Sequence, residues 1–201
     1  MRKTGVVIVL VVIGTLIAHA DNDSIRNWIL DSYVRYVEKY IGSRWESPNA
    51  TLFAEFKTNG NRTRYEQWTF AKRRQLAALV LAEKVEGKGR FMPDIVNGIM
   101  STLEETWWGI PAHYGTKVMR AEDQNVDLFN AETAGLMVWT KHALQQQIDS
   151  FSPLLSQRID AEIERRMLIP ALETDYWWKR ASMNWNAWIC SNWIAYSTRC
   201  R

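Results

Sequence analysis

The stretch SPLLSQRIDAEIERRMLIP, at residues 152–170, carries the apolar spacing of an amphipathic helix. Its apolar residues recur every four positions and so lie along one side of a helix: Leu155, Ile159, Ile163 and Met167. The charged residues between them fall mostly outside this stripe and indicate a solvated face. Pro153 suits a first helical turn, where no hydrogen bond is lost. Pro170 should bend or end the helix near Ile169, because its ring clashes with the carbonyl one turn back.

The same helical spacing recurs through most of the chain, and no sustained alternation of apolar and polar residues indicates a strand. We therefore predict an all-α fold, with a long polar loop at residues 43–63. Further helices are expected at 24–41, 68–85 and 95–107, and from Asp127 or Asn130 to about Leu144. Short connections between successive helices favour antiparallel pairs, so the expected architecture is a stack of antiparallel helical hairpins.

The composition is that of a globular protein that can bury a core: 201 residues, 47% hydrophobic and 23% charged. The formal net charge is +3. Removing Arg2 and Lys3 from the 25 basic residues leaves 23 against 22 acidic ones. Such a balance gives no electrostatic footprint for nucleic acid, so we expect no nucleic-acid partner.

The first twenty residues have the organisation of an export signal. Arg2 and Lys3 precede an apolar run at residues 6–17, and Ala18-His19-Ala20 matches a cleavage site. A transmembrane anchor is the alternative, but the run is shorter than the roughly 20 residues that a span needs. We therefore expect a signal peptide at 1–20, one helical domain at 21–201 with no stable membrane span, and a periplasmic or secreted protein.

The region between Tyr176 and Trp193 holds five of the eleven tryptophans together with three asparagines. Indole faces match the C–H faces of pyranose rings, and carboxamides offer both donors and acceptors to sugar hydroxyls and carboxylates. This mixture favours a carbohydrate-binding surface. Packing of the same indoles in a helical core explains their density equally well.

Four short motifs carry a resemblance to a known family. They are WWGIPAH at 107–113, DLFNAETA at 127–134, RRMLIP at 165–170 and NWNAWICSNW at 184–193. In this order they resemble the helical domain of heparinase II/III-like polysaccharide lyases. The resemblance implies an incomplete (α/α) toroid with a long cleft for an acidic polysaccharide, followed in complete members by a β-sandwich. Since the sequence ends soon after the fourth motif, we interpret it as a C-terminally incomplete domain.

The chemistry that this resemblance implies is β-elimination at a uronic acid, in a polysaccharide of the heparan sulfate or alginate type, without a cofactor or metal. A donor must stabilise the carboxylate as negative charge develops on it, and a carboxamide can do so without titrating. We expect Asn186, or else Asn184, in this catalytic role; two residues apart on a helix, they point in nearly opposite directions. Helix capping or satisfaction of buried backbone by these asparagines is the alternative. In the family the base lies beyond this motif, so we expect the chain to lack it.

Residues expected to contact the substrate are His113, Trp108, Tyr176, Arg180 and Trp185. The histidine lies in a turn and can donate to a sugar or carboxylate, and the arginine can bind a uronate or sulfate through two hydrogen bonds. The signatures of serine hydrolases, zinc peptidases and nucleotide-binding loops are absent from the sequence. A glycosidase using Glu104-Glu105 or Glu122-Asp123 stays open. The competing function is a non-catalytic secreted glycan-binding helical protein.

Overall fold

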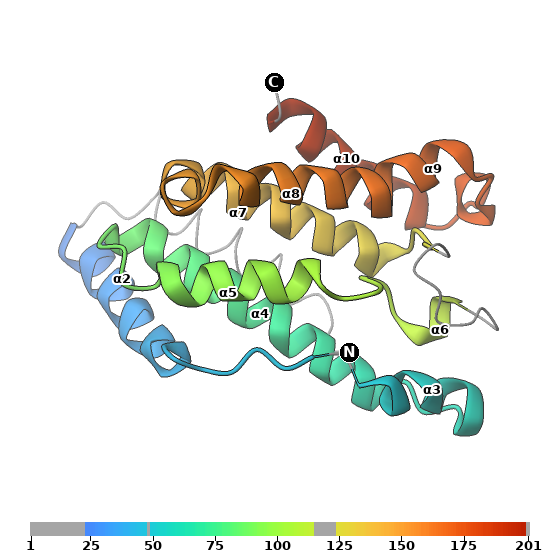
Figure 1. Ribbon diagram of the computed structural model, residues 1–201, viewed down its shortest axis with the longest axis horizontal. Coiled ribbons are helices and arrows are strands. Elements are labelled where there is room, and N and C mark those ends of the chain that lie inside the picture. Colours follow the sequence, from blue (N-terminus) through green and yellow to red (C-terminus); the bar gives the residue numbers. More distant parts are fainter. Residues whose placement is uncertain (1–22, 48, 115–123, 200–201) are drawn as a thin grey trace.

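The computed structural model describes residues 23–47, 49–114 and 124–199, and these residues are helical with no strand among them (Figure 1). The prediction of an all-α fold is therefore confirmed. Among the described helices, none combines the length and the apolar character needed to cross a membrane. The expected signal peptide at residues 1–20 lies outside the described residues.

The elements follow one another as α2 (Asp23–Val37), the 3-10 turn η1 (Glu38–Tyr40), α3 (Ala50–Asn59), α4 (Thr63–Glu86), α5 (Met92–Leu103), α6 (Pro111–Tyr114), α7 (Leu128–Phe151), α8 (Pro153–Ile163), the π-helical turn η2 (Glu164–Leu168), α9 (Ile169–Glu173), the 3-10 turn η3 (Trp177–Lys179) and α10 (Trp185–Arg199).

Two antiparallel hairpins, α4–α5 and α7–α8, make up the body of the fold (Figure 1). Helix α7 is central, because it packs against α4, α5, α8 and α10. The first hairpin turns at Gly87 and Gly89, whose positive φ angles of 68° and 76° favour glycine. The core between the hairpins consists of fully buried side chains, among them Leu76, Leu79, Ile95, Ile99, Met137, Leu144, Ile148, Ile159 and Ile163.

The prediction of a long loop at residues 43–63 is wrong for the second half of this segment, where helix α3 lies. The Oδ1 of Asn49 accepts from the backbone N–H groups of Thr51 and Leu52, and Gly60 ends the helix at a φ of 77°. Phe53 packs on Tyr65 at a ring-centroid distance of 5.2 Å. An asparagine cap and a glycine stop eleven residues further on are helix signals that outweigh the polar composition of this segment.

The stretch at 152–170 keeps its predicted buried stripe. Of the two outcomes expected near Ile169, a bend or an end of the helix, the end is not found there. The chain passes through the π-helical turn η2 and continues as α9, with Pro170 in the first turn of α9. Proline has no N–H to donate to the carbonyl four residues earlier, which belongs to Arg166. The Nδ2 of Asn130 on α7 donates to that carbonyl instead, at 3.1 Å. A tertiary contact thus makes the proline tolerable here.

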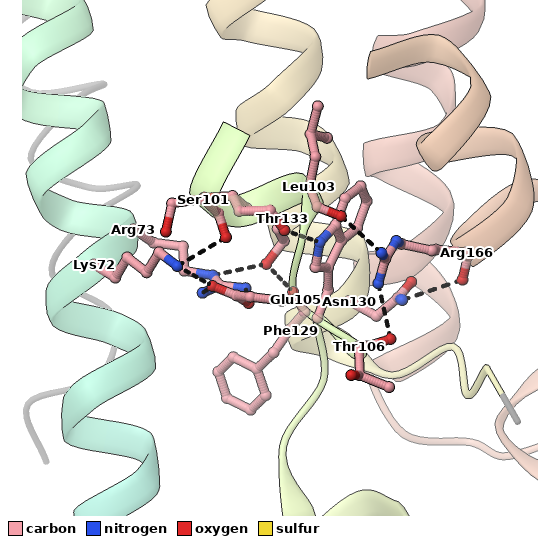
Figure 2. A network of polar contacts seen from close by, with 12 residues as sticks. Lys72, Arg73, Ser101, Leu103, Glu105, Thr106, Phe129, Asn130, Thr133 and Arg166 are labelled. Atoms are coloured by element: carbon pink, nitrogen blue, oxygen red, sulfur yellow. Dashed lines mark hydrogen bonds and ion pairs between the residues drawn. The ribbon is translucent and has the colours of Figure 1, made fainter. Parts of the chain in front are cut away.

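A buried polar network fixes the segment that follows α5 (Figure 2). Glu105 is only 1% exposed and binds the guanidinium of Arg73 through both carboxylate oxygens, at 2.8 and 2.5 Å. The Nζ of Lys72 lies 2.8 Å from Oε1 of the same carboxylate. Arg73 also donates from Nε to the hydroxyl of Thr133, so α4, α7 and the segment after α5 are joined at one point.

Arg166 ties the same segment to the α8–α9 region. Its guanidinium donates to the carbonyl oxygens of Leu103 at 2.9 Å and Thr106 at 2.8 Å (Figure 2). Its Nε binds Glu162, which supplies the opposite charge. Residues 103–106 are held from two sides. The turn that follows them, at residues 107–114, therefore starts from a fixed position.

Candidate functional site

The site is built around Asp127, which is 0% exposed and caps α7. Its Oδ1 accepts from the backbone N–H of Asn130 at 2.7 Å. Its Oδ2 accepts from the N–H of Ile110 at 3.2 Å and lies 2.8 Å from Nδ1 of His113. One carboxylate therefore starts α7, anchors the turn before α6, and orients the histidine ring.

The four residues that lead into α7 are each held by a separate contact. Gln124 donates from its amide to the carbonyl of Thr106, and Asn125 donates to the carbonyl of His113 at 2.7 Å. The carbonyl of Val126 accepts the indole N–H of Trp178 at 2.9 Å. These bonds, with those of Asp127, make the segment a rigid support for the histidine.

Aromatic rings surround the imidazole of His113. It stacks on Phe129 with a centroid distance of 5.7 Å and an interplanar angle of 18°, and it contacts the indole of Trp185 at 4.7 Å. The ring of Trp177 lies 5.0 Å from that of Trp185. Trp177 is 59% exposed, so this group opens onto solvent and presents indole surface next to the histidine.

Helices α7 and α10 run parallel to each other at this site. His113 contacts Phe129 on α7 and Trp185 on α10. Three residues further along both helices, the indole N–H of Trp188 donates to Oε1 of Glu132 at 3.1 Å.

The next contact along the two helices brings Asn192 of α10 against Gly135 of α7, and a Cβ on that glycine would collide with the asparagine Oδ1. Each successive turn of α7 therefore contacts the next turn of α10. This register places Glu132 one helical turn from the histidine site.

The carboxyl group of Glu132 is half-buried, and its pKa is raised to about 7. Loss of hydration on burial is the main cause, and the charge of Asp127 adds to it, while the hydrogen bond from Trp188 acts in the opposite direction. Near neutral pH this group can therefore exist either as an acid or as a carboxylate. That property suits a group that transfers protons or recognises anions.

The two asparagines expected to act in catalysis lie at the start of α10 and differ in their surroundings. Asn184 is exposed, and its backbone carbonyl accepts from the N–H of Trp188 in the first helical turn. Asn186 is half-buried; its Nδ2 donates to the carbonyl of Lys179 at 3.2 Å and its Oδ1 accepts from the thiol of Cys190 at 3.0 Å. Neither residue is sealed in the core.

The other residues expected to contact substrate do not gather around His113, apart from Trp185. Trp108 is 1% exposed and donates its indole N–H to the carbonyl of Thr102, so it is a core residue and cannot present a face to a ligand. Tyr176 is buried and donates to the carbonyl of Gln124, and burial raises its pKa. Arg180 is exposed and paired with Asp175.

Sequence reasoning missed Asp127 and Glu132 as site residues, although both stand in the DLFNAETA motif. Asp127 was expected only as a helix start. The signal that could have found Glu132 is its spacing from Phe129, because positions three apart share a face of α7. Of the glycosidase alternatives, Glu105 is buried in its ion pairs, and Glu122-Asp123 lies outside the described residues.

No protein-family model matches the chain, and no curated protein matches it. Within the part of the chain that the structure describes, no group of three or more His, Cys, Asp or Glu side chains could hold a metal ion. The candidate site is therefore defined by its own geometry: a carboxylate-held histidine, a titratable glutamate and partly exposed indoles.

Proposed function

We propose that the protein is a carbohydrate-active helical domain of the heparinase II/III-like type, which acts on a uronate-containing polysaccharide by β-elimination. The observation that supports this most is the hydrogen-bonded pair of His113 and Asp127 with Trp185 and Trp177 alongside. Three of the four motifs behind the family resemblance contribute to the site or its support: 107–113, 127–134 and 184–193.

The pair of His113 and Asp127 can bind and move a proton. If Nδ1–H donates to the buried carboxylate, Nε2 is the ring nitrogen that accepts a proton. In β-elimination the C5–H bond breaks, its electron pair forms the C4=C5 double bond, and the C4–O bond breaks. The base keeps the C5 proton, and the departing oxygen takes up a proton from solvent water. We assign the role of base to Nε2 of His113, in place of the expectation that the chain lacks one.

The indoles supply the binding surface in this proposal. The exposed indole of Trp177 and the half-buried indole of Trp185 offer apolar area that suits the C–H face of a sugar ring. For the carboxylate of the uronate we favour Asn184 over Asn186. Asn184 is exposed, whereas the carboxamide of Asn186 already bonds to Lys179 and Cys190.

The same proposal includes the toroid arrangement of the helices and the location of the protein. The stacked hairpins α4–α5 and α7–α8 are consistent with part of an incomplete (α/α) toroid. A periplasmic or secreted location is supported by the sequence of residues 1–20.

The decisive experiment is to incubate the purified chain with heparan sulfate and with alginate and to follow the ultraviolet absorbance of the unsaturated uronate product. The proposal expects product from one of these polymers and a loss of roughly 10²–10⁴-fold in rate for His113→Gln. His142→Gln is the matched control, since His142 is exposed near the middle of α7 and contacts Trp139. Equal rates for the two variants would contradict the role of His113.

A non-catalytic glycan-binding protein is the second candidate, and the exposure of Trp177 favours it. An exposed indole beside a second indole binds sugars without any chemistry. Binding of the polymers without any rise in absorbance would establish this candidate, and the absence of both would refute both functions.

A further inference from the structure

Glu132 lies next to the proposed sugar site but has no part in the chemistry assigned so far. It occupies the same face of α7 as Phe129, and its partner Trp188 occupies the same face of α10 as Trp185. A helical turn advances about 5 Å, which is close to the length of one sugar ring, so Glu132 follows the His113 contacts by about one ring length along α7.

The electrostatic surroundings of Glu132 disfavour its charged form. On α7 the charge of Asp127, which is also negative, raises the pKa of Glu132. On α6, His113 is bound to Asp127, and α10 contributes the neutral indole of Trp188. On α4, Arg73 is bound to Glu105 and Thr133.

No basic side chain forms an ion pair with Glu132 within residues 23–47, 49–114 and 124–199. The half-buried carboxyl group is thus stabilised as the neutral acid, which keeps an O–H to donate.

We propose that Glu132, in its neutral form, donates a hydrogen bond to the anionic sugar bound beside His113, and that ionisation of Glu132 expels this ligand. The inference rests on the proposed function, because it requires a uronate ligand at this site. A carboxylate at position 132 would face the ligand's own carboxylate across a partly buried surface, where like charges repel strongly.

The size of the effect follows from the fraction of neutral Glu132. Its pKa of about 7 means that at pH 6 most of the protein has a neutral Glu132 and is competent to bind the ligand. At pH 8 about one molecule in eleven keeps the proton, so the apparent affinity should be about tenfold weaker than at pH 6. Binding of the anion should in turn raise the midpoint at which Glu132 titrates.

The experiment measures the binding of an alginate-derived uronate hexasaccharide from pH 6 to 8.5, with the wild-type chain and three variants. Glu132→Gln keeps a neutral donor and an oxygen for Trp188, so its affinity should be independent of pH over this range. Glu173→Gln, an equal change at an exposed position on α9, should behave as the wild type. His113→Gln removes turnover, and it should retain the weakening above pH 7.

A second measurement needs no variant. The indole N–H signal of Trp188 in a nuclear magnetic resonance titration reports the ionisation of Glu132, because the two groups are hydrogen-bonded. Its midpoint should move to higher pH when the hexasaccharide is saturating. A midpoint that the sugar leaves unchanged overturns the inference.

The outcomes separate the two proposals. Binding that weakens above pH 7 in the wild type but not in Glu132→Gln supports the role of Glu132. Binding with the same pH dependence in both proteins overturns that role and leaves the proposed function standing. No binding at any pH, either of this hexasaccharide or of a heparan sulfate hexasaccharide, refutes the proposed function, and this inference with it.

Discussion

Replacing Asp127 by asparagine tests the centre of the site, because the two oxygens of this carboxylate accept hydrogen bonds from three donors. An asparagine has only one oxygen. If that oxygen stays with the N–H of Asn130, the new NH₂ group faces the N–H of Ile110, which then lacks an acceptor in the interior. The imidazole of His113 must also change its tautomer, so that Nδ1 accepts a hydrogen bond.

The expected cost of this substitution can be built from its parts. A buried donor left without a partner costs about 1–3 kcal/mol, and loss of a hydrogen bond to a charged group costs about 1.5–3 kcal/mol. Because the new NH₂ can donate to Nδ1, part of the second cost is recovered. We expect Asp127→Asn to lower the free energy of unfolding by about 3 kcal/mol, and Asp127→Ala by about 4 kcal/mol, since it also removes the helix cap.

Urea denaturation followed by circular dichroism measures these losses, and nitrogen NMR of the His113 ring reports the tautomer. Asp149→Asn is the matched control, because Asp149 accepts from the hydroxyl of Ser156 and an amide oxygen can do the same. A loss below about 1 kcal/mol for Asp127→Asn, with an unchanged tautomer, would refute the assigned contacts. The catalytic prediction is separate: any lyase activity should fall with the wrong tautomer even where the variant is folded.

Three further outcomes are expected in denaturation experiments. Glu105→Gln should cost about 3–5 kcal/mol of unfolding free energy, because it leaves Lys72 buried without its counter-charge. Gly98→Ala should cost about 2 kcal/mol, because a methyl group there would lie 2.5 Å from the rigid indole of Trp45. Glu132 has a folded pKa of about 7 against an ordinary value of 4.5, so the unfolded chain releases its proton first as the pH rises. The wild type should therefore lose up to about 3 kcal/mol between these two pH values, and Glu132→Gln should not. A stability difference between these two proteins that is constant with pH would contradict the raised pKa.

Local signals in the sequence predicted most of the helices, because caps and apolar spacing act within a few residues. Asp127 was expected as a possible helix start, and its side chain caps α7. The buried stripe of α8 and η2 was predicted from four residues at constant spacing. The missed helix α3 also carries local signals, Asn49 and Gly60, which its polar composition concealed.

The contacts that build the site could not be predicted in the same way, because they join residues far apart in the chain. Nothing near Pro170 indicates that Asn130 will supply the donor that the proline lacks. The raised pKa of Glu132 depends on burial against α10, more than fifty residues away. Such properties arise from packing, which sequence spacing does not encode.

The tryptophans show why residue density alone misleads about function. Trp108 and Trp178 are buried, and their indole N–H groups bind the carbonyls of Thr102 and Val126, which places the segments on either side of the histidine turn. Trp177 is exposed and contacts Trp185, which reaches His113. The same residue type therefore supports the site in one place and forms its surface in another. Because Val126 precedes Asp127 directly, the buried indoles fix the carboxylate that orients the imidazole, and the proposed glycan surface depends on the core beneath it.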